Sequence, residues 1–158
     1  HAYVIAGSSF TDGLSAVSAA GATSSPVVFV RTGTQLDSRD ATNLATLGID
    51  RITIVGGLSS AVEAGLRTLY GTENVTRITG SDRYATNVAT IEAAIPSSQE
   101  AYLALGTGFI FAPSGAALAG IKDAPVYLVP GSCIPKVVSD SILEMGVEKI
   151  TLLGATSI

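Results

Sequence analysis

The sequence has few residues of the types on which catalytic and metal sites depend. Its 158 residues include one cysteine (Cys133), one histidine (His1) and no tryptophan. A single cysteine cannot form a disulfide within the chain, and zinc motifs need several cysteines or histidines in close spacing. A catalytic triad also needs a base, for which an N-terminal histidine is a poor candidate. We therefore expect no enzyme, no metal and no cofactor.

Charged residues are scarce as well. They make up 14% of the sequence, against about 25% in a usual globular domain, while hydrophobic residues make up 47%. This balance excludes intrinsic disorder, which needs few apolar residues and many charges. It also predicts that neighbouring repeats, or a second copy of the chain in a homo-oligomer, cover part of the surface.

The sequence lacks the positive charge that nucleic-acid binding needs and the long apolar segment that a membrane span needs. Nine lysines and arginines oppose thirteen aspartates and glutamates, giving a net charge of −4, whereas nucleic-acid binding depends on basic patches. Apolar runs are short, such as residues 26–30, which end at Arg31, so no segment approaches the roughly 18 residues that span a bilayer. We therefore expect no nucleic-acid partner and no membrane span.

A long internal repeat is the clearest feature of what is present. Ala2 aligns with Ala101, and the same offset of 99 residues keeps glycine, proline and strand-like positions in step. Residues 59–100 lie between the two copies and appear once. The sequence therefore predicts about one and a half repeats of a longer array. The matching segments are residues 2–7 with 101–106, 26–27 with 125–126, and, one deletion later, 47–53 with 145–151.

Short apolar runs alternate with helical patterns along the chain. The runs are rich in valine and isoleucine and apolar on both faces, which is typical of strands in a parallel sheet covered on both sides. Alternating strands and helices predict an α/β fold of strand–helix repeats with a mostly parallel sheet. The expected strands are residues 3–7, 26–31, 51–55, 75–78, 101–105, 125–129 and 149–153.

Three apolar stripes at helical spacing predict helices that pack on these strands. Ser60 and Glu63 form a capping-box pattern at the start of the first helix. Asp82 is the expected N-cap of the second, and Gly146 ends the third. The stripes are Val62, Leu66 and Leu69; Tyr84, Val88, Ile91 and Ile95; and Val138, Ile142 and Met145.

The loop that follows the first expected strand, residues 7–13, is a candidate binding site. Ligands gather at the carboxyl ends of strands in α/β sheets, and Ser8, Ser9 and Asp12 would line this end. No G-x-G-x-x-G or Walker A pattern is present, which disfavours a nucleotide-binding enzyme on a Rossmann-like fold. The alternative is that Ser9, Thr11 or Asp12 caps the following helix. In the second copy, Phe111 stands at the position of Asp12.

A second candidate site is the segment 77–87, in which two arginines flank a strand end and a helix start. Arg83, in the first turn of the helix, opposes the helix dipole unless Asp82, another carboxylate or an anionic ligand compensates. Arginine presents a planar fork of donors to phosphate and carboxylate groups, so Arg77 and Arg83 could contact an anion. The alternative is an internal ion pair that holds neighbouring repeats together.

The pattern R-x-x-G-x-D-R-Y-x-T over residues 77–86, followed by an alanine-rich helix, resembles the opening of the cell wall binding repeat 2 family. The loop at residues 7–15, the strand at 26–30 and the strand ending in Gly-Gly at 52–57 resemble later parts of the same repeat. The resemblance thus covers essentially the whole chain.

This resemblance divides the chain into two repeats. Residues 1–76 would be a first repeat without its leading Arg-x-x-Gly-x-Asp-Arg-Tyr element, and residues 77–158 a second repeat truncated after its last strand. The resemblance implies Rossmann- or Toprim-like units, with three repeats arranged around a pseudo-threefold axis.

The resemblance also implies a function. Members are extracellular modules of mostly Gram-positive surface proteins, and they attach a protein to the cell wall by binding an anionic polymer, teichoic-acid-like or a secondary polysaccharide. The alternative is a structural or oligomerisation repeat without a polymer site of its own. The ligand-binding residues expected under the first hypothesis are Arg77, Asp82, Arg83, Thr86, Ser8, Ser9 and Asp12.

Overall fold

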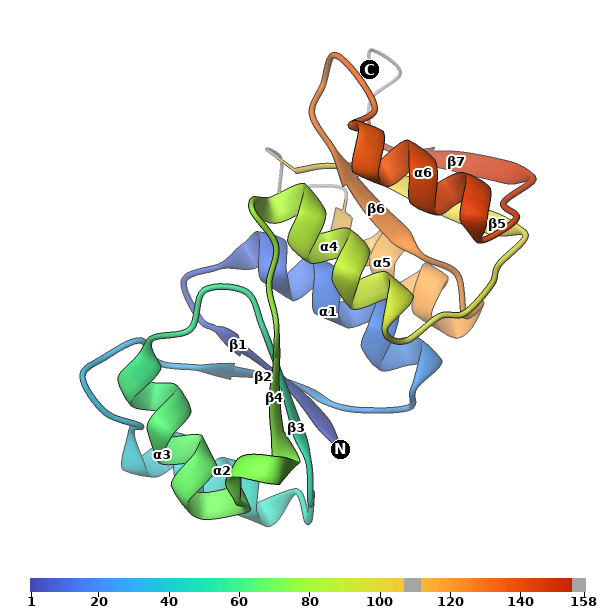
Figure 1. The fold of residues 1–158 in the computed structure, drawn as a ribbon. Coiled ribbons are helices and arrows are strands. Elements are labelled where there is room, and N and C mark those ends of the chain that lie inside the picture. Colours follow the sequence, from blue (N-terminus) through green and yellow to red (C-terminus); the bar gives the residue numbers. More distant parts are fainter. Residues whose placement is uncertain (107–111, 155–158) are drawn as a thin grey trace.

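The computed structural model describes residues 1–106 and 112–154. Strands and helices alternate throughout that part, and every described strand pairs in parallel with its neighbours. The strands form two separate sheets, which occupy the lower and upper parts of the molecule in Figure 1. The α/β fold predicted from the sequence is therefore confirmed, and all seven predicted strands are present with their ends displaced by at most one residue.

The first sheet contains four strands from the N-terminal half of the chain, in the order β2-β1-β3-β4. β1 lies inside the sheet, and all five of its residues are buried, as expected for an apolar strand covered on both faces. A short 3₁₀ turn, η1 (Thr72–Asn74), leads into the last strand. The strands are β1 (Ala2–Ala6), β2 (Val27–Val30), β3 (Ile52–Val55) and β4 (Val75–Ile78).

Helices cover both faces of this sheet. On one face, α1 (Phe10–Ala22) packs Ala16 and Ala19 against the strands. On the other face, α2 (Ser38–Thr46) and α3 (Ser60–Tyr70) contribute fully buried leucine and valine side chains. Because these alanines are small, α1 lies close to the first sheet. Leu14 of the same helix packs among core residues of the second sheet.

The second sheet contains β5 (Glu100–Leu105), β6 (Val126–Val129) and β7 (Lys149–Leu153). Their order, β6-β5-β7, is the same as the order β2-β1-β3 in the first sheet, which agrees with the internal repeat seen in the sequence. The connecting helices are α5 (Ala112–Ile121) and α6 (Lys136–Glu144). The predicted boundary between residues 76 and 77 falls inside β4, and the division into repeats stays a prediction.

Two helices join the sheets. α4 (Arg83–Glu92) directly follows β4 of the first sheet, but its buried face, with Val88 and Ile91, packs against β6 and α6 of the second. α1 belongs to the first sheet and packs Leu14 among the core residues of the second. Figure 1 shows α1 and α4 side by side between the two sheets.

A close helix contact forms where α1 meets α5. Gly21 of α1 faces Gly120 of α5, and a Cβ atom added at Gly21 would overlap the Gly120 backbone. Since these two positions match at the repeat offset of 99, the same glycine of each copy builds the contact. The absence of both side chains therefore sets how closely the two halves of the molecule approach.

Three expectations about packing are wrong. The capping box does not form, because Ser59, one residue before Ser60, caps α3 by accepting the Val62 N–H at 3.3 Å. Leu69 is 56% exposed, because it borders a surface hollow between α2 and α3. β7 is not covered on both faces, since four of its five residues are exposed.

Candidate functional site

The loops after β1, β3 and β4 meet at one edge of the first sheet, because parallel strands end on the same side. The first loop contains Ser8 and Ser9, the second contains Gly56 and Gly57, and the third leads to Asp82. The chain leaves β1 toward β2 on one side and then returns to β3 on the other, so the topological switch point lies between β1 and β3. Ligands of open α/β sheets bind at such points.

Arg77 is engaged entirely within the protein. Its Nε donates to Glu63 Oε2 at 2.8 Å, Nη1 donates to the Gly56 carbonyl oxygen at 2.7 Å, and Nη2 donates to the Leu58 carbonyl oxygen at 2.8 Å. Each nitrogen of the guanidinium therefore has a protein partner. The ion pair with Glu63 lies between β4 and α3 of the first sheet, and the hydrogen bonds of Arg77 tie the loop after β3 to β4.

Glu63, in the first turn of α3, is the shared partner of two arginines. Its Oε1 accepts from Arg67 Nε at 3.0 Å and Arg67 Nη2 at 2.7 Å, while Oε2 faces Arg77. Burial raises the pKa of Glu63, but the hydrogen bonds from Arg67 and Arg77 outweigh it and hold the pKa below its ordinary value. The carboxylate is therefore charged near neutral pH and holds α3 against β4.

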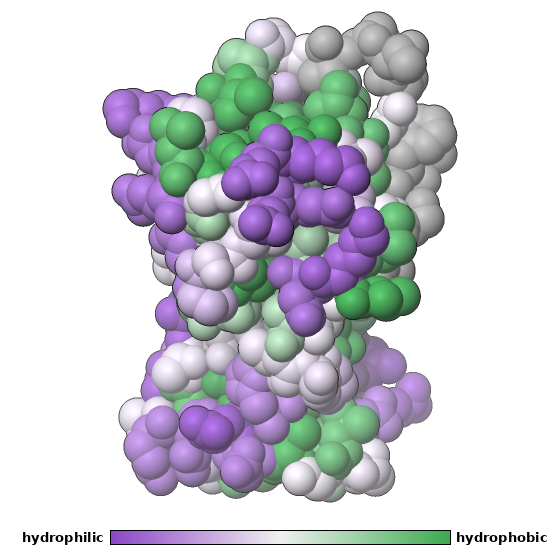
Figure 2. Space-filling model, turned by 90° about the vertical axis from the view of Figure 1, so that its right-hand side faces the viewer, coloured by the Kyte–Doolittle hydropathy of each residue, from purple (hydrophilic) through white to green (hydrophobic). Residues whose placement is uncertain are grey.

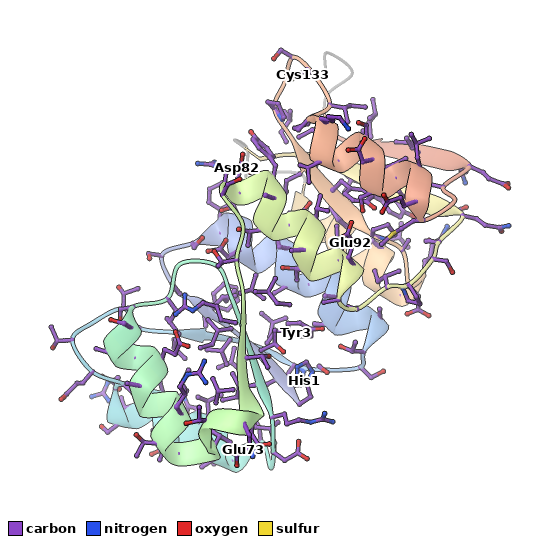
Figure 3. All side chains as sticks on the ribbon, viewed as in Figure 1. His1, Tyr3, Glu73, Asp82, Glu92 and Cys133 are labelled. Carbon is purple, nitrogen blue, oxygen red and sulfur yellow. The ribbon has the colours of Figure 1, made fainter. Side chains whose placement is uncertain are left out.

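Asp82 caps α4, as the sequence predicts. Its Oδ1 accepts the N–H groups of Tyr84 and Ala85, both at 2.8 Å. Figure 3 shows Asp82 at one end of α4 and Glu92 at the other. The cap satisfies two of the N–H groups that a helix start leaves without partners.

Arg83 follows the cap and is exposed. Its Nη1 donates to the Gly106 carbonyl oxygen at 2.8 Å, at the end of β5 in the second sheet. Within residues 1–106 and 112–154, no carboxylate forms an ion pair with Arg83, Asp82 included. A neutral carbonyl is thus the bonded partner of this cation, which also faces the positive end of the helix dipole.

Ser9 and Asp12 lie at the start of α1. Ser9 accepts the Asp12 N–H at 3.5 Å and acts as the N-cap, whereas Ser8 is exposed. Asp12 is only 9% exposed, and its carboxylate lies against Gly56, where a Cβ atom would overlap the carboxylate oxygens. Gly56 has φ of +75°, a backbone conformation that favours glycine. No donor of the described residues forms a hydrogen bond with this carboxylate.

Thr86, the fourth predicted residue of this segment, is buried, and its Oγ1 accepts the Gly80 N–H at 2.9 Å. A Cβ atom at Gly80 would overlap the first turn of α4, so the turn and the helix are in close contact there. Thr86 therefore fixes the approach of β4 to α4.

Asn87 is the residue that the sequence reasoning missed. Its Nδ2 donates to the Val126 carbonyl oxygen at 2.9 Å and to Ser15 Oγ at 3.2 Å, and its Oδ1 accepts the Leu128 N–H at 2.8 Å. The side chain is fully buried and pairs with β6 much as a neighbouring strand would. The signal available in the sequence was its amide side chain, immediately before Val88 of the apolar stripe.

Metal ligands, the cysteine and long apolar helices bear on what this part of the chain can bind. No group of three or more histidine, cysteine, aspartate or glutamate side chains in this part could hold a metal ion. Cys133 is exposed, in the loop before α6 (Figure 3). None of the helices described is long and apolar enough to cross a bilayer. Most of the second glycine loop, with Phe111, lies outside the described residues.

The fold is a parallel α/β array with polar loops gathered at one edge of the first sheet. The family model for Cell wall binding domain 2 (CWB2) matches residues 77–158, which is just over half of the chain. The chain belongs to this family, and the resemblance seen in the sequence is confirmed. It is therefore a cell wall binding domain by family.

Solved structures show the same fold. Cwp6 from Clostridium difficile superposes with a TM-score of 0.84 at 20% identity, over 100% of this chain and 26% of that one. Cwp8 from the same organism superposes with a TM-score of 0.81 at 26% identity, over 99% of this chain and 27% of that one. The chain thus spans about a quarter of the length of each. No curated protein matches the sequence.

Proposed function

We propose that the chain is a non-catalytic module that attaches a surface protein to the Gram-positive cell wall by binding an anionic wall polymer, teichoic-acid-like or a secondary polysaccharide. Membership of the family supports both the attachment and a location at the cell surface. The proposal of an anionic ligand rests on Arg83, an exposed cation without a carboxylate partner in the described part of the chain.

Arg83 offers an anion a guanidinium without a carboxylate partner among the described residues. The N–H groups of Tyr84 and Ala85 at the start of α4 already donate to Asp82, so a phosphate or carboxylate would gain mainly from the arginine. The net charge of −4 gives no overall attraction to an anionic polymer, so the contact has to be local. Arg77 acts indirectly, by holding the loop at Gly56 in place.

Sedimentation with purified Gram-positive walls tests this proposal. Walls before and after acid extraction of anionic polymers are compared over a salt series, with Arg83→Gln as the variant. Loss of a charge-assisted hydrogen bond worth about 1.5–3 kcal/mol weakens binding roughly tenfold or more. Arg51→Gln is the matched control, because Arg51 is also exposed but precedes β3 at the opposite edge of the sheet. Unchanged binding after extraction contradicts the polymer, and unchanged binding by Arg83→Gln contradicts its role.

A second candidate function, assembly with neighbouring repeats or further copies, is favoured by a difference between the two sheets. Phe29 of β2 and Leu128 of β6 occupy matching positions at the offset of 99. Leu128 is fully buried in a core that includes Leu14 of α1, whereas Phe29 is 55% exposed beside a hollow of about 410 Å³. A helix supplied from outside, as α1 is supplied to β6, would cover Phe29.

The second sheet also has an apolar surface. Ile150 and Leu152 of β7 are 44% and 51% exposed. Figure 2 shows hydrophobic surface beside a hydrophilic band on the upper half of the molecule, where this sheet lies. Light scattering after size exclusion tests the assembly. We expect the wild-type chain to self-associate and Phe29→Ser to be monomeric, with Arg83→Gln unchanged; a monomeric wild type contradicts self-association.

A further inference from the structure

We propose that the start of α1 is a saccharide subsite, in which the Asp12 carboxylate accepts hydrogen bonds from neighbouring hydroxyl groups of a sugar ring. The inference rests on the proposed function and extends it. It assigns the neutral, hydroxylated part of the wall polymer to the loop after β1, and leaves the anionic part to Arg83.

The carboxylate of Asp12 is unusual because the residue is mostly buried, yet no protein donor reaches its oxygens. Asp12 is 9% exposed, and its own N–H is used by Ser9, but none of the described residues donates to its side-chain oxygens. Ser18 Oγ is the buried polar side-chain atom without a partner in the described part of the chain, so the oxygens of Asp12 are open to solvent. The first turn of α1 favours a negative charge, yet it supplies no donor to these oxygens. Two acceptor oxygens are therefore held in place without a partner.

The floor beneath the carboxylate is built by glycine and held rigidly. Gly56 donates its N–H to the Ile78 carbonyl oxygen at 2.9 Å and accepts Arg77 Nη1 at its own carbonyl oxygen at 2.7 Å. Any side chain at Gly56 would overlap Asp12. The ion pair of Arg77 with Glu63 thus fixes a cradle that only a residue without Cβ can form.

The approach to this carboxylate is open. Ser8 and Gly57 are exposed on the two loops that flank the switch point between β1 and β3. A Cβ atom at Gly57 would meet nothing within 4 Å, so the space above this loop is free in the described part of the molecule. A ligand that enters over Gly57 reaches the exposed part of Asp12 from the sheet edge.

The chemistry of the site selects hydroxyl groups. A carboxylate accepts hydrogen bonds and repels phosphate, so Asp12 cannot hold the anionic groups of a polymer. Neighbouring hydroxyls of a pyranose can donate to its two oxygens at once. The Ser8 hydroxyl and the Gly57 N–H, which has no bonded partner among the described residues, can donate to the sugar oxygens in return.

The internal repeat separates this role from folding. In the second copy, phenylalanine replaces the aspartate at the matching position, residue 111. A repeat of this family can therefore be built without a carboxylate there. The single copy of the carboxylate predicts one saccharide subsite, on the first sheet.

Asp12→Asn tests the subsite, because it removes the charge and keeps the shape. Saturation-transfer NMR is recorded on the full chain with methyl glucoside and N-acetylglucosamine, and then with inorganic phosphate as competitor. We expect sugar signals with the wild type, a loss of about tenfold in affinity with Asp12→Asn, and no competition by phosphate. Asp140→Asn, on the exposed face of α6, is the matched control and retains the wild-type signals.

The melting temperature distinguishes binding from structure. No protein group pairs with the Asp12 carboxylate, so Asp12→Asn loses only its interaction with the helix dipole and melts within about 4 °C of the wild type, whereas a structural role lowers the melting temperature further. The proposal is overturned by a melting temperature lowered by more than about 4 °C, by equal sugar signals in both proteins, or by no signal with the wild type. Wall binding that survives acid extraction, with sugar signals intact, overturns the anionic-polymer function and leaves the subsite standing.

Discussion

Asn87→Ala is the sharpest test of how the two halves of the molecule are joined. Asn87 projects from α4, which follows the first sheet, and forms hydrogen bonds with the backbone of β6 in the second. The alanine variant leaves the Val126 carbonyl oxygen and the Leu128 N–H buried and without these partners. Neither group can turn to water, because Val126 and Leu128 are fully buried.

The magnitude follows from these contacts. Each buried backbone group left unsatisfied costs about 1–3 kcal/mol, so two of them give roughly 2–6 kcal/mol, with a small further loss from Ser15. At roughly 2–4 °C per kcal/mol for a protein of this size, the melting temperature falls by at least about 4 °C.

Urea denaturation followed by circular dichroism measures the change directly. We expect the midpoint to fall with little change in slope, because the folded and unfolded states expose similar surfaces in both proteins. Asn43→Ala, an exposed asparagine on α2, is the control and changes stability by less than about 0.5 kcal/mol. A loss below about 0.5 kcal/mol for Asn87→Ala would refute the idea that this amide joins the sheets.

Two further predictions concern the acid range and the helix contact. The folded pKa of Glu63 lies below its unfolded value near 4.5, so its stabilisation is present above that value and is lost as pH falls through the folded pKa. Urea midpoints between neutral pH and about pH 3 measure this loss, and a Glu63→Gln variant with an equally steep decline would contradict it. Gly21→Val drives a side chain into the Gly120 backbone and should cost about 1–3 kcal/mol or more in thermal unfolding. The exposed Gly33→Val is its control, and equal melting of the two variants would argue against the close contact.

Local patterns predicted most of the fold. Strand positions were clear because short valine- and isoleucine-rich runs alternate with helical stripes. Asp82 marked the start of α4 because aspartate is a favoured N-cap and its carboxylate accepts the first N–H groups of the helix. Ser60 misled because Ser59 precedes it and both are serines, so spacing alone could not choose between them. Leu69 misled because the helical period shows which face of α3 a side chain lies on, but not whether another element reaches far enough to cover it.

The site was harder to predict than the fold. Arg77 and Arg83 stand in the same motif, and only the three-dimensional arrangement shows that Glu63, fourteen positions before Arg77, neutralises one and not the other. Asp12 was recognisable as a loop residue, but its burial depends on Gly56 from a different strand. Asn87 has a partner 39 residues away, at Val126. Such pairings depend on tertiary structure, which a single sequence does not display.

α1 belongs to the first sheet but also covers part of the second, and α4 follows the first sheet but packs on the second. We therefore expect that neither half of the chain folds by itself. A chain divided after β4 would leave the first piece with α1 exposing Leu14, and would leave the second with β6 lacking that cover. Denaturation should therefore proceed as a single cooperative event instead of two. We therefore expect fragments 1–78 and 79–158, expressed separately, to be less ordered than the intact chain, because each lacks helix cover that the other supplies.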